Sequence, residues 1–461
     1  MRFECAILLL LAAALAVPAS AAVKPYGLFT DGAVLQQGTA VPVWGSASDG
    51  EKVTVKFQGQ TASTTAMSGI WMVHLKPLKP GGPFTMKISS KENTVELKDM
   101  LVGEVWVCSG QSNMAWPLNA SEGADQTIAA SGDPMLRLYT VPYSVVPVKD
   151  LAASWQVCGP DTSGDFSAVG YFFGRDLRKA LKVPVGLINS SVGGTPAEAW
   201  TSRRALKSYP ELASILETPR GRFGRPTCLY NGMIAPLIPY AIRGAIWYQG
   251  EGNAWAAYQY RTLFPAMIKD WRDNWAQGDF PFLFVQLAPF GNIAVNAWPE
   301  LREAQLLTFL NVPKTGMAVI TDVGEKEDIH PKKKEPVGGR LAIAARATAY
   351  GEDIVFSGPI YKSMQIEGDR EILSFDPIGG GLVAKDGDLT GFTIAGEDQN
   401  FVPAQAVIQG DKVAVWSPQS PKPVAVRYGW ENFPVVNLFN KEGLPATPFR
   451  TDDFPMLTGP K

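Results

Sequence analysis

The feature of the sequence that most restricts its fold is the alternation of short apolar runs with helical patterns over residues 99–353. Runs of this length and apolarity are typical of strands buried on both faces, and the longer segments between them carry apolar residues at helical spacing. Such an alternation indicates βαβ units, and hence a parallel sheet covered by helices on both faces. We therefore predict an α/β domain. The strands are expected at Glu104–Cys108, Val185–Asn189, Ala245–Tyr248, Phe282–Gln286 and Met317–Thr321, and the helices at Phe172–Leu181, Tyr258–Trp275, Pro299–Leu310 and Val337–Tyr350.

The segments on both sides of this region have a different sequence pattern. Residues 23–98 and 354–461 contain short alternating segments separated by Gly, Asp and Ser, which predicts a β-sandwich-like domain at each end, with the C-terminal tail folded back. The N-terminal flank carries no ionisable cluster, so we expect it to shape the central domain rather than to bind a ligand independently. The segments are Ala40–Trp44, Lys52–Phe57 and Thr85–Ile88 before the centre, and Val383–Lys385, Phe392–Ala395, Lys412–Trp416 and Val424–Tyr428 after it.

Residues 1–22 have the pattern of a secretory signal peptide. A basic Arg2 precedes the apolar run Ala6–Val17, and the small residues of Ala19–Ala22 provide a cleavage site. The run is too short to span a membrane, and no other segment is continuously apolar over the length that a span needs. We expect an exported protein, periplasmic or extracellular, with no membrane span.

Composition excludes some partners. The 42 basic and 44 acidic residues give a net charge of −2, which provides no electrostatic case for binding nucleic acid. Outside the signal segment the cysteines are Cys108, Cys158 and Cys228, and they lack the spacing of a metal site. They leave open one disulfide, such as Cys158 with Cys228, beside a buried thiol. The 13 Trp, 13 Tyr and 22 Phe allow a few rings to stack on a sugar, although most must be core.

Ser112 is the candidate nucleophile. The apolar run Val105–Cys108 ends at Ser109 and Gly110, so Ser112 follows directly on a buried strand. Open α/β sheets bind their ligands outside the carboxyl ends of the strands, where this hydroxyl would lie. The alternative is that Ser112 is only the N-cap of a helix.

The chain has only two histidines to serve as a base for such a serine. His74 lies in the alternating segment 71–75, far before the central domain, and is expected to be a solvated strand residue. His330 follows the run Met317–Thr321, and so would reach the same sheet edge as Ser112. Asp328 is close enough in sequence to orient the His330 ring. The alternative is an Asp-capped loop before a helix.

Gly193 and Gly194 follow the predicted strand at 185–189. Two consecutive glycines allow backbone conformations closed to other residues, so an amide there can turn toward a developing oxyanion. An ordinary turn between strand and helix is the alternative.

Four motifs occur in a fixed order: Gly110-Gln-Ser-Asn-Met114, Gly193-Gly-Thr-Pro-Ala-Glu-Ala-Trp200, Trp247-Tyr-Gln-Gly-Glu251 and Asp328-Ile-His-Pro331. Together they resemble the sialate O-acetylesterase family of the SGNH (GDSL-like) hydrolase superfamily. The similarity extends through residues 229–236 and 427–430 and so covers nearly all of the chain after the signal segment. Each motif alone is weak, but four in order are specific.

The resemblance implies an SGNH-type sheet and a serine esterase that removes acetyl groups from sugars, with 9-O-acetylated sialic acid as the implied substrate. Ser112 would attack the ester, His330 would take its proton, and Asp328 would orient the ring. The oxyanion would be stabilised by the amides of Ser112 and Gly194 and by the side chain of Gln249. No metal or organic cofactor is implied. Residues expected to support the site without reacting are Asn113, Gly193, Glu251 and Glu327.

The carboxylate partner of His330 stays open at this point. The superfamily commonly spaces the two as Asp-x-x-His, but here Glu327 lies three residues before His330 and Asp328 lies two before. A Ser–His dyad without a carboxylate is a further alternative.

Two other functions compete with this interpretation. The same scaffold can serve an esterase for acetylated xylan or another polysaccharide. A glycan-binding protein without activity is disfavoured because Ser112 and His330 are both present. The α/β-hydrolase fold is disfavoured because Gly110-Gln-Ser-Asn-Met114 lacks the second glycine of Gly-x-Ser-x-Gly.

Overall fold

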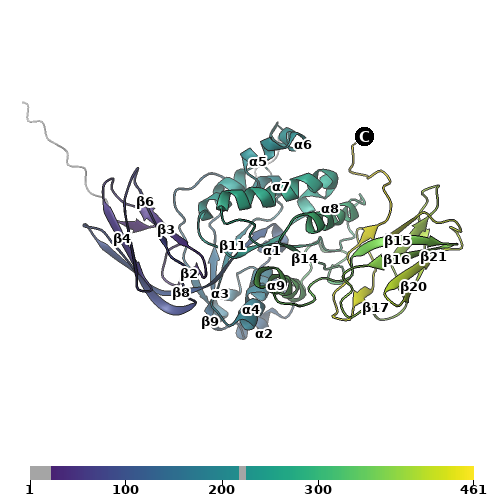
Figure 1. Cartoon of the computed structure of the whole chain (residues 1–461), viewed down its shortest axis with the longest axis horizontal. Helices are drawn as coiled ribbons and strands as arrows, with labels where there is room; N and C mark the ends of the chain where they lie inside the picture. The colour runs from purple at the N-terminus through teal and green to yellow at the C-terminus, as the bar shows by residue number, and fades with distance from the viewer. Residues whose placement is uncertain (1–21, 218–224, 461) are drawn as a thin grey trace, which may run out of the picture.

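A computed structural model describes residues 22–217 and 225–460, and the predicted signal segment therefore lies almost wholly outside the described residues. The chain forms three parts in a row, with a β region at each end and an α/β region between them (Figure 1). The α/β part contains every candidate site residue.

The central sheet has the strand order β10-β9-β11-β8-β12-β13-β14. Every neighbouring pair from β9 to β14 is parallel, as predicted, and only β10 runs antiparallel at the edge. The bounds are β8 Thr94–Gly110, β9 Asp133–Thr140, β10 Gln156–Cys158, β11 Val185–Ser191, β12 Gly244–Tyr248, β13 Phe282–Val285 and β14 Thr315–Ala318.

Helices cover both faces of this sheet (Figure 1), because alternate side chains of each strand are apolar in both directions. On β8, Trp106 and Cys108 pack in the cluster that contains α4 (Ala168–Leu181) and α9 (Glu335–Tyr350). Val105 and Val107 pack in the opposite cluster with α7 (Ala257–Trp275) and α8 (Trp298–Asn311). The four predicted helices therefore exist, each within four residues of the expected start.

Strand β8 belongs to two parts of the molecule. Its first half pairs with β7 and β2 in the N-terminal region, and its second half is the central strand between β11 and β12. The domain boundary expected between residues 98 and 99 therefore falls inside a continuous strand. The other N-terminal strands are β1 Lys24–Pro25, β2 Val34–Gln36, β3 Val41–Ser46, β4 Lys52–Phe57, β5 Gln60–Thr65, β6 Ile70–Leu75 and β7 Gly81–Ser89.

The C-terminal region contains two four-stranded antiparallel sheets that share one apolar core. Its tail returns to the central region, where Glu300 on α8 accepts hydrogen bonds from the amides of Leu457 and Thr458. One sheet is β15 (Tyr361–Glu367), β16 (Arg370–Phe375), β21 (Lys412–Trp416) and β20 (Gln405–Gln409); the other is β19 (Val402–Pro403), β18 (Phe392–Ala395), β22 (Ala425–Tyr428) and β24 (Phe449–Arg450); and β17 (Leu382–Ala384) pairs with β23 (Leu438–Asn440).

Short helices connect these elements, and the first of them carries the candidate serine. They are α1 Ser112–Ala115, α2 Ala124–Ala129, α3 Pro160–Ser163, α5 Arg203–Ser208 and α6 Pro210–Ala213, the 3-10 turns η1 Leu118–Ala120, η2 Ala197–Trp200, η3 Ser214–Glu217, η5 Ala235–Leu237 and η6 Glu251–Ala256, and the π-helical turn η4 Tyr230–Ile234.

The three described cysteines are free and buried, so the disulfide left open by the sequence is not formed. Within residues 22–217 and 225–460, no helix is long and apolar enough to cross a membrane. In the same part of the chain, no group of three or more His, Cys, Asp or Glu could hold a metal ion.

Candidate active site

Ser112 begins α1 directly beyond the carboxyl end of β8, at the sheet edge that the sequence predicts. Gly110 makes this turn possible. Its φ is 138°, and a Cβ at this position would lie 2.1 Å from the carbonyl oxygen of Tyr248 on the neighbouring strand. The amide of Gln111 then donates a 2.9 Å hydrogen bond to the same carbonyl. The end of β12 therefore fixes where the serine leaves the sheet.

Gly193 and Gly194 lie beside Ser112 after β11. A Cβ on Gly193 would lie 3.3 Å from the Ser112 Cβ, and Gly194 adopts a φ of 71°, which favours glycine. Both glycines are exposed, and neither amide donates to another described residue. Unpaired backbone donors next to a serine are what an oxyanion site requires.

His330 lies in the segment between β14 and α9, together with Asp328. The Asp328 Oδ1 accepts a 2.9 Å hydrogen bond from the His330 backbone amide and lies 3.6 Å from the imidazole Nδ1. Glu327 is exposed and makes no hydrogen bond or ion pair with a described residue. The structure therefore places Asp328, and not Glu327, beside the ring.

Two contacts bring His330 to the helix that carries Ser112. The ring stacks on Trp116, with centroids 5.0 Å apart and planes 19° apart. The side chain of Asn113 donates a 3.0 Å hydrogen bond to the Ile329 carbonyl oxygen. No hydrogen bond joins the Ser112 hydroxyl to His330 in the described part of the chain; such bonds commonly tighten only when substrate is bound.

The environment of His330 favours its neutral form. Burial lowers the pKa of the imidazole below its ordinary 6.5, the charge of Lys334 lowers it further, and Asp328 acts in the opposite direction. A neutral imidazole at neutral pH can accept a proton, which a general base must do.

A buried polar cluster lies behind Ser112 and consists of Asn113, Glu251 and Lys334. The Lys334 ammonium donates to Asn113 Oδ1, and Asn113 Nδ2 donates a 2.6 Å hydrogen bond to Glu251 Oε1. Burial raises the pKa of Glu251 and lowers that of Lys334 to about 7. The sequence predicts supporting roles for Asn113 and Glu251 but gives none to Lys334. The sequence feature that could have identified Lys334 is its spacing, because it lies four residues after His330 and directly before the last helix.

The structure does not support the predicted oxyanion role of Gln249. Its side chain is fully buried, and both amide hydrogens are donated elsewhere, to the Thr195 carbonyl at 3.2 Å and to Asn253 Oδ1 at 2.7 Å. Its oxygen accepts a 2.9 Å hydrogen bond from the Tyr260 hydroxyl. With no hydrogen left for an oxyanion, Gln249 instead holds the turn that follows Gly194.

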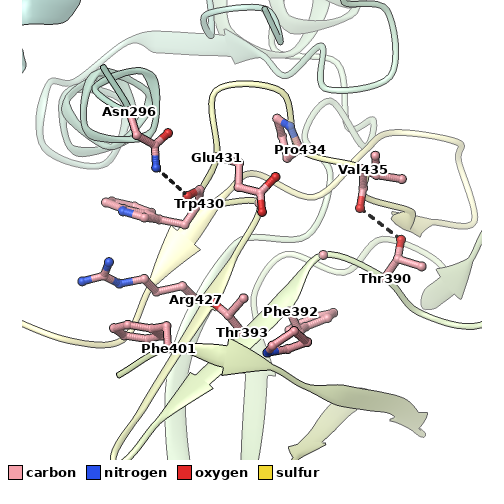
Figure 2. A pocket seen from close by; sticks show the side chains of 13 residues that line it. Asn296, Thr390, Phe392, Thr393, Phe401, Arg427, Trp430, Glu431, Pro434 and Val435 are labelled. Carbon is pink, nitrogen blue, oxygen red and sulfur yellow. Dashed lines mark hydrogen bonds between the residues drawn. The ribbon is translucent and has the colours of Figure 1, made fainter. Parts of the chain in front are cut away.

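A separate hollow of about 550 Å³ lies where the C-terminal region meets the segment before α8 (Figure 2). The Arg427 guanidinium lies over the rings of Phe401 and Trp430, at 4.0 and 5.4 Å from their centroids. It is also paired with Asp452 at 2.8 Å. The Arg450 guanidinium also lies 5.5 Å from the Trp430 ring centre, so cations cover ring faces in this hollow on which a sugar could otherwise stack.

A serine, two glycines with free amides and a histidine, all at the carboxyl edge of a parallel sheet, place the protein in the class of SGNH-type hydrolases. A family model described as "Carbohydrate esterase, sialic acid-specific acetylesterase" matches residues 102–346. The chain belongs to this family.

Relatives support the same assignment. The rat sialate O-acetylesterase is 34% identical over 406 residues, with 72% of this chain and 74% of the rat protein covered. The human sialate O-acetylesterase is 35% identical over 377 residues, with 72% of each chain covered. A crystal structure of a novel carbohydrate acetylesterase from Xanthomonas citri is 42% identical and superposes with a TM-score of 0.89, covering 94% of this chain and all of that one.

Proposed function

We propose that this protein is a serine carbohydrate O-acetylesterase that hydrolyses acetyl esters on sugars. The observation that carries the proposal is the junction between Asn113 and Ile329, which holds the candidate nucleophile segment against the candidate base segment. The free amides of Gly193 and Gly194 beside Ser112 add the donors that acyl transfer needs.

The reaction begins when His330 takes the proton of Ser112 as the serine oxygen attacks the acetyl carbonyl. The negative charge that develops on the carbonyl oxygen is stabilised by the amides of Ser112 and Gly194, each donor contributing roughly 3 kcal/mol. His330 then gives its proton to the departing sugar hydroxyl, which leaves an acetyl-serine. Water, activated by the same imidazole, releases acetate and restores Ser112. Asp328 orients His330 and stabilises its cation.

We propose 9-O-acetylated sialic acid as the substrate. Support comes from the family match and from the rat and human relatives that carry the name sialate O-acetylesterase. Acetylated xylan or another polysaccharide is the second candidate. It is favoured by the Xanthomonas citri protein, which is more similar in sequence and whose description names only a carbohydrate.

The test is acetate release from O-acetylated sialic acids, acetylated xylan fragments and other acetylated glycans, by the wild type and by Ser112→Ala. We expect release from at least one sugar class and a loss of at least a thousandfold in Ser112→Ala. The matched control is Ser109→Ala, three residues earlier in the chain, which removes a buried hydroxyl that has no hydrogen-bond partner among the described residues. Wild-type turnover in Ser112→Ala would refute the serine mechanism, and release from xylan alone would refute the sialate assignment.

We also propose that the protein is exported, on the basis of the signal-like pattern of residues 1–22. The mass of the protein recovered from its native compartment tests this. A mature chain that retains the apolar run Ala6–Val17 would contradict it.

A further inference from the structure

We propose that Lys334 is a positioning residue of the esterase site: its buried ammonium fixes the Asn113 amide that joins the Ser112 helix to the His330 segment, and it sets a positive charge beside the base. This inference rests on the proposed Ser112–His330 mechanism. It adds a residue that acts through its neighbours and does not touch the substrate.

Lys334 is an unusual lysine because it is only 1% exposed. Its ammonium donates to Asn113 Oδ1 and lies 5.7 Å from the ring centre of Trp116 and 5.5 Å from that of Tyr248. Two ring faces and one amide oxygen partly replace the water that the cation has lost. Lys332 and Lys333, immediately before it, are both exposed. Burying a lysine is costly, so a lysine held here calls for a role that an apolar residue could not fill.

Asn113 is the residue that Lys334 holds in place, and it connects the Ser112 helix to the His330 segment. Its side chain is fully buried, and its Nδ2 donates both to Glu251 Oε1 at 2.6 Å and to the Ile329 carbonyl at 3.0 Å. Asn113 follows Ser112 in the chain, and Ile329 precedes His330. A rotation of this one amide would therefore change the placement of the nucleophile relative to the base.

The chemistry of lysine explains why it can hold that amide in one orientation. An ammonium only donates hydrogen bonds, so it fixes which end of the Asn113 amide is the oxygen. The nitrogen must then face the Ile329 carbonyl, which only accepts, and the Glu251 carboxylate, which accepts when ionised. An apolar side chain at position 334 would leave the Asn113 oxygen without this partner, and the amide could turn over.

The charge of Lys334 is the second part of the role. The charged groups that face it are Glu251 at the start of η6, Glu325 and Asp328 in the segment after β14, and His330 itself. The positive charge disfavours protonation of His330 and lowers the pKa of the imidazole. Burial lowers the pKa of the Lys334 ammonium to about 7, while the carboxylates of Glu251, Asp328 and Glu325 act in the opposite direction and favour its charged form.

The test compares Lys334→Met with Lys333→Met, the same substitution at the neighbouring exposed position. Protonation of His330 is followed directly by NMR of ring-labelled histidine. Because the chain has only two histidines, the exposed His74 serves as an internal reference. In Lys334→Met we expect the His330 pKa to rise. We also expect kcat on a chromogenic acetate ester to fall about tenfold to a hundredfold, with KM little changed. Lys333→Met should match the wild type in both measurements.

Lys334→Gln separates the two parts of the role, because it keeps a donor and removes the charge. It should raise the His330 pKa as Lys334→Met does but lose less kcat. An unchanged His330 pKa in folded Lys334→Met or Lys334→Gln would overturn the inference, as would a wild-type kcat in Lys334→Met. A lower melting temperature with unchanged His330 titration would indicate a merely structural lysine and would also overturn it.

The NMR titration does not depend on turnover. A failure of the serine mechanism, seen as activity in Ser112→Ala, is therefore distinguishable from a failure of the Lys334 inference.

Discussion

The side chain of Asn113 donates a 3.0 Å hydrogen bond to the backbone carbonyl of Ile329, joining two residues that are 216 positions apart in the chain. One of them follows the candidate nucleophile and the other precedes the candidate base. Together with the stacking of His330 on Trp116, the contact bridges α1 and the segment after β14, which follow strands that are not neighbours in the sheet. The geometry of the proposed reaction therefore depends on a residue that does not react.

Asn113→Ala should lower kcat by about tenfold to a hundredfold, because the nucleophile and the base lose their common anchor. It should also lower the free energy of unfolding by about 1–3 kcal/mol, since Glu251 and Lys334 each lose a buried partner. Ester kinetics and an unfolding scan measure the two effects. Asn119→Ala, at an exposed position of the next turn, is the control and should behave as the wild type. Unchanged kcat in folded Asn113→Ala would contradict the prediction.

Asp328→Asn should lower kcat roughly tenfold to a hundredfold, less than Ser112→Ala or His330→Ala. The Asp328 carboxylate is near the ring, but at 3.6 Å from Nδ1 it is beyond ordinary hydrogen-bond distance, so it assists a largely two-residue mechanism. Glu327→Gln, one residue earlier, should leave kcat unchanged because Glu327 is exposed. A larger loss in Glu327→Gln than in Asp328→Asn would reverse the assignment.

The pH dependence of kcat/KM should show an acid limb at the pKa of His330. Because burial and Lys334 lower this pKa, the imidazole stays neutral below pH 6.5 and activity should persist into that range. Below its pKa, protonation removes the base and kcat/KM should fall tenfold per pH unit. A profile measured from pH 4.5 to 9 checks this, and an acid limb above pH 6.5 would be inconsistent with the environment of His330.

Gln249→Ala should lower the melting temperature while kcat changes less than threefold in protein that remains folded. The reason is that both Gln249 amide hydrogens are bound to Thr195 and Asn253, so the side chain stabilises a turn and does not face an oxyanion. Kinetics beside an unfolding scan decide the matter. A hundredfold loss of kcat at unchanged melting temperature would restore the oxyanion role predicted from the sequence.

Glu371 should make the C-terminal region less stable as pH rises from 4.5 through 7. Glu371 is a residue of strand β16 and is fully buried, and neither of its carboxylate oxygens has a partner among the described residues. Burial raises its pKa from 4.5 to about 7. A raised carboxyl pKa means that the folded state binds the proton more tightly, so stability is greatest below pH 4.5 and falls by about 3 kcal/mol as pH rises to 7.

Glu371→Gln should therefore shrink the difference in melting temperature between pH 5 and pH 8. Glu367→Gln, at an exposed position of β15, is the matched control and should keep the wild-type difference. An equal pH dependence in the two variants would contradict a buried, titrating Glu371.

Most of the fold could be predicted because the strands that lead to the site each contain a short run of buried apolar residues, such as Val105–Cys108 on β8. The two strands at one end of the sheet, β10 and β9, could not be predicted from the sequence. β9 carries Asp133, Pro134 and Arg137, which break the apolar pattern, and the buried Arg137 pairs with Asp99 at 2.6 Å. Such a pair joins residues far apart in sequence, and no local pattern reveals it.

In the candidate site too, some features could be predicted from the sequence and others could not. Ser112, Gly194 and His330 each follow a strand, so position along the chain is enough to find them. The partners of Gln249 and Lys334 depend on which way a side chain turns once the strands are assembled. Sequence spacing fixes the position of Gln249 at the sheet edge but not the two acceptors that take its hydrogens.

The length of β8 has a practical consequence for the design of fragments of this protein. A chain cut between residues 98 and 99 would divide one strand into two pieces, of which one ends the N-terminal β region and the other begins the central sheet. The strand that delivers Ser112 is held at its far end by β2 and β7. A minimal catalytic fragment would therefore have to begin near residue 22, and grafting this esterase into another protein would mean carrying its N-terminal β region along.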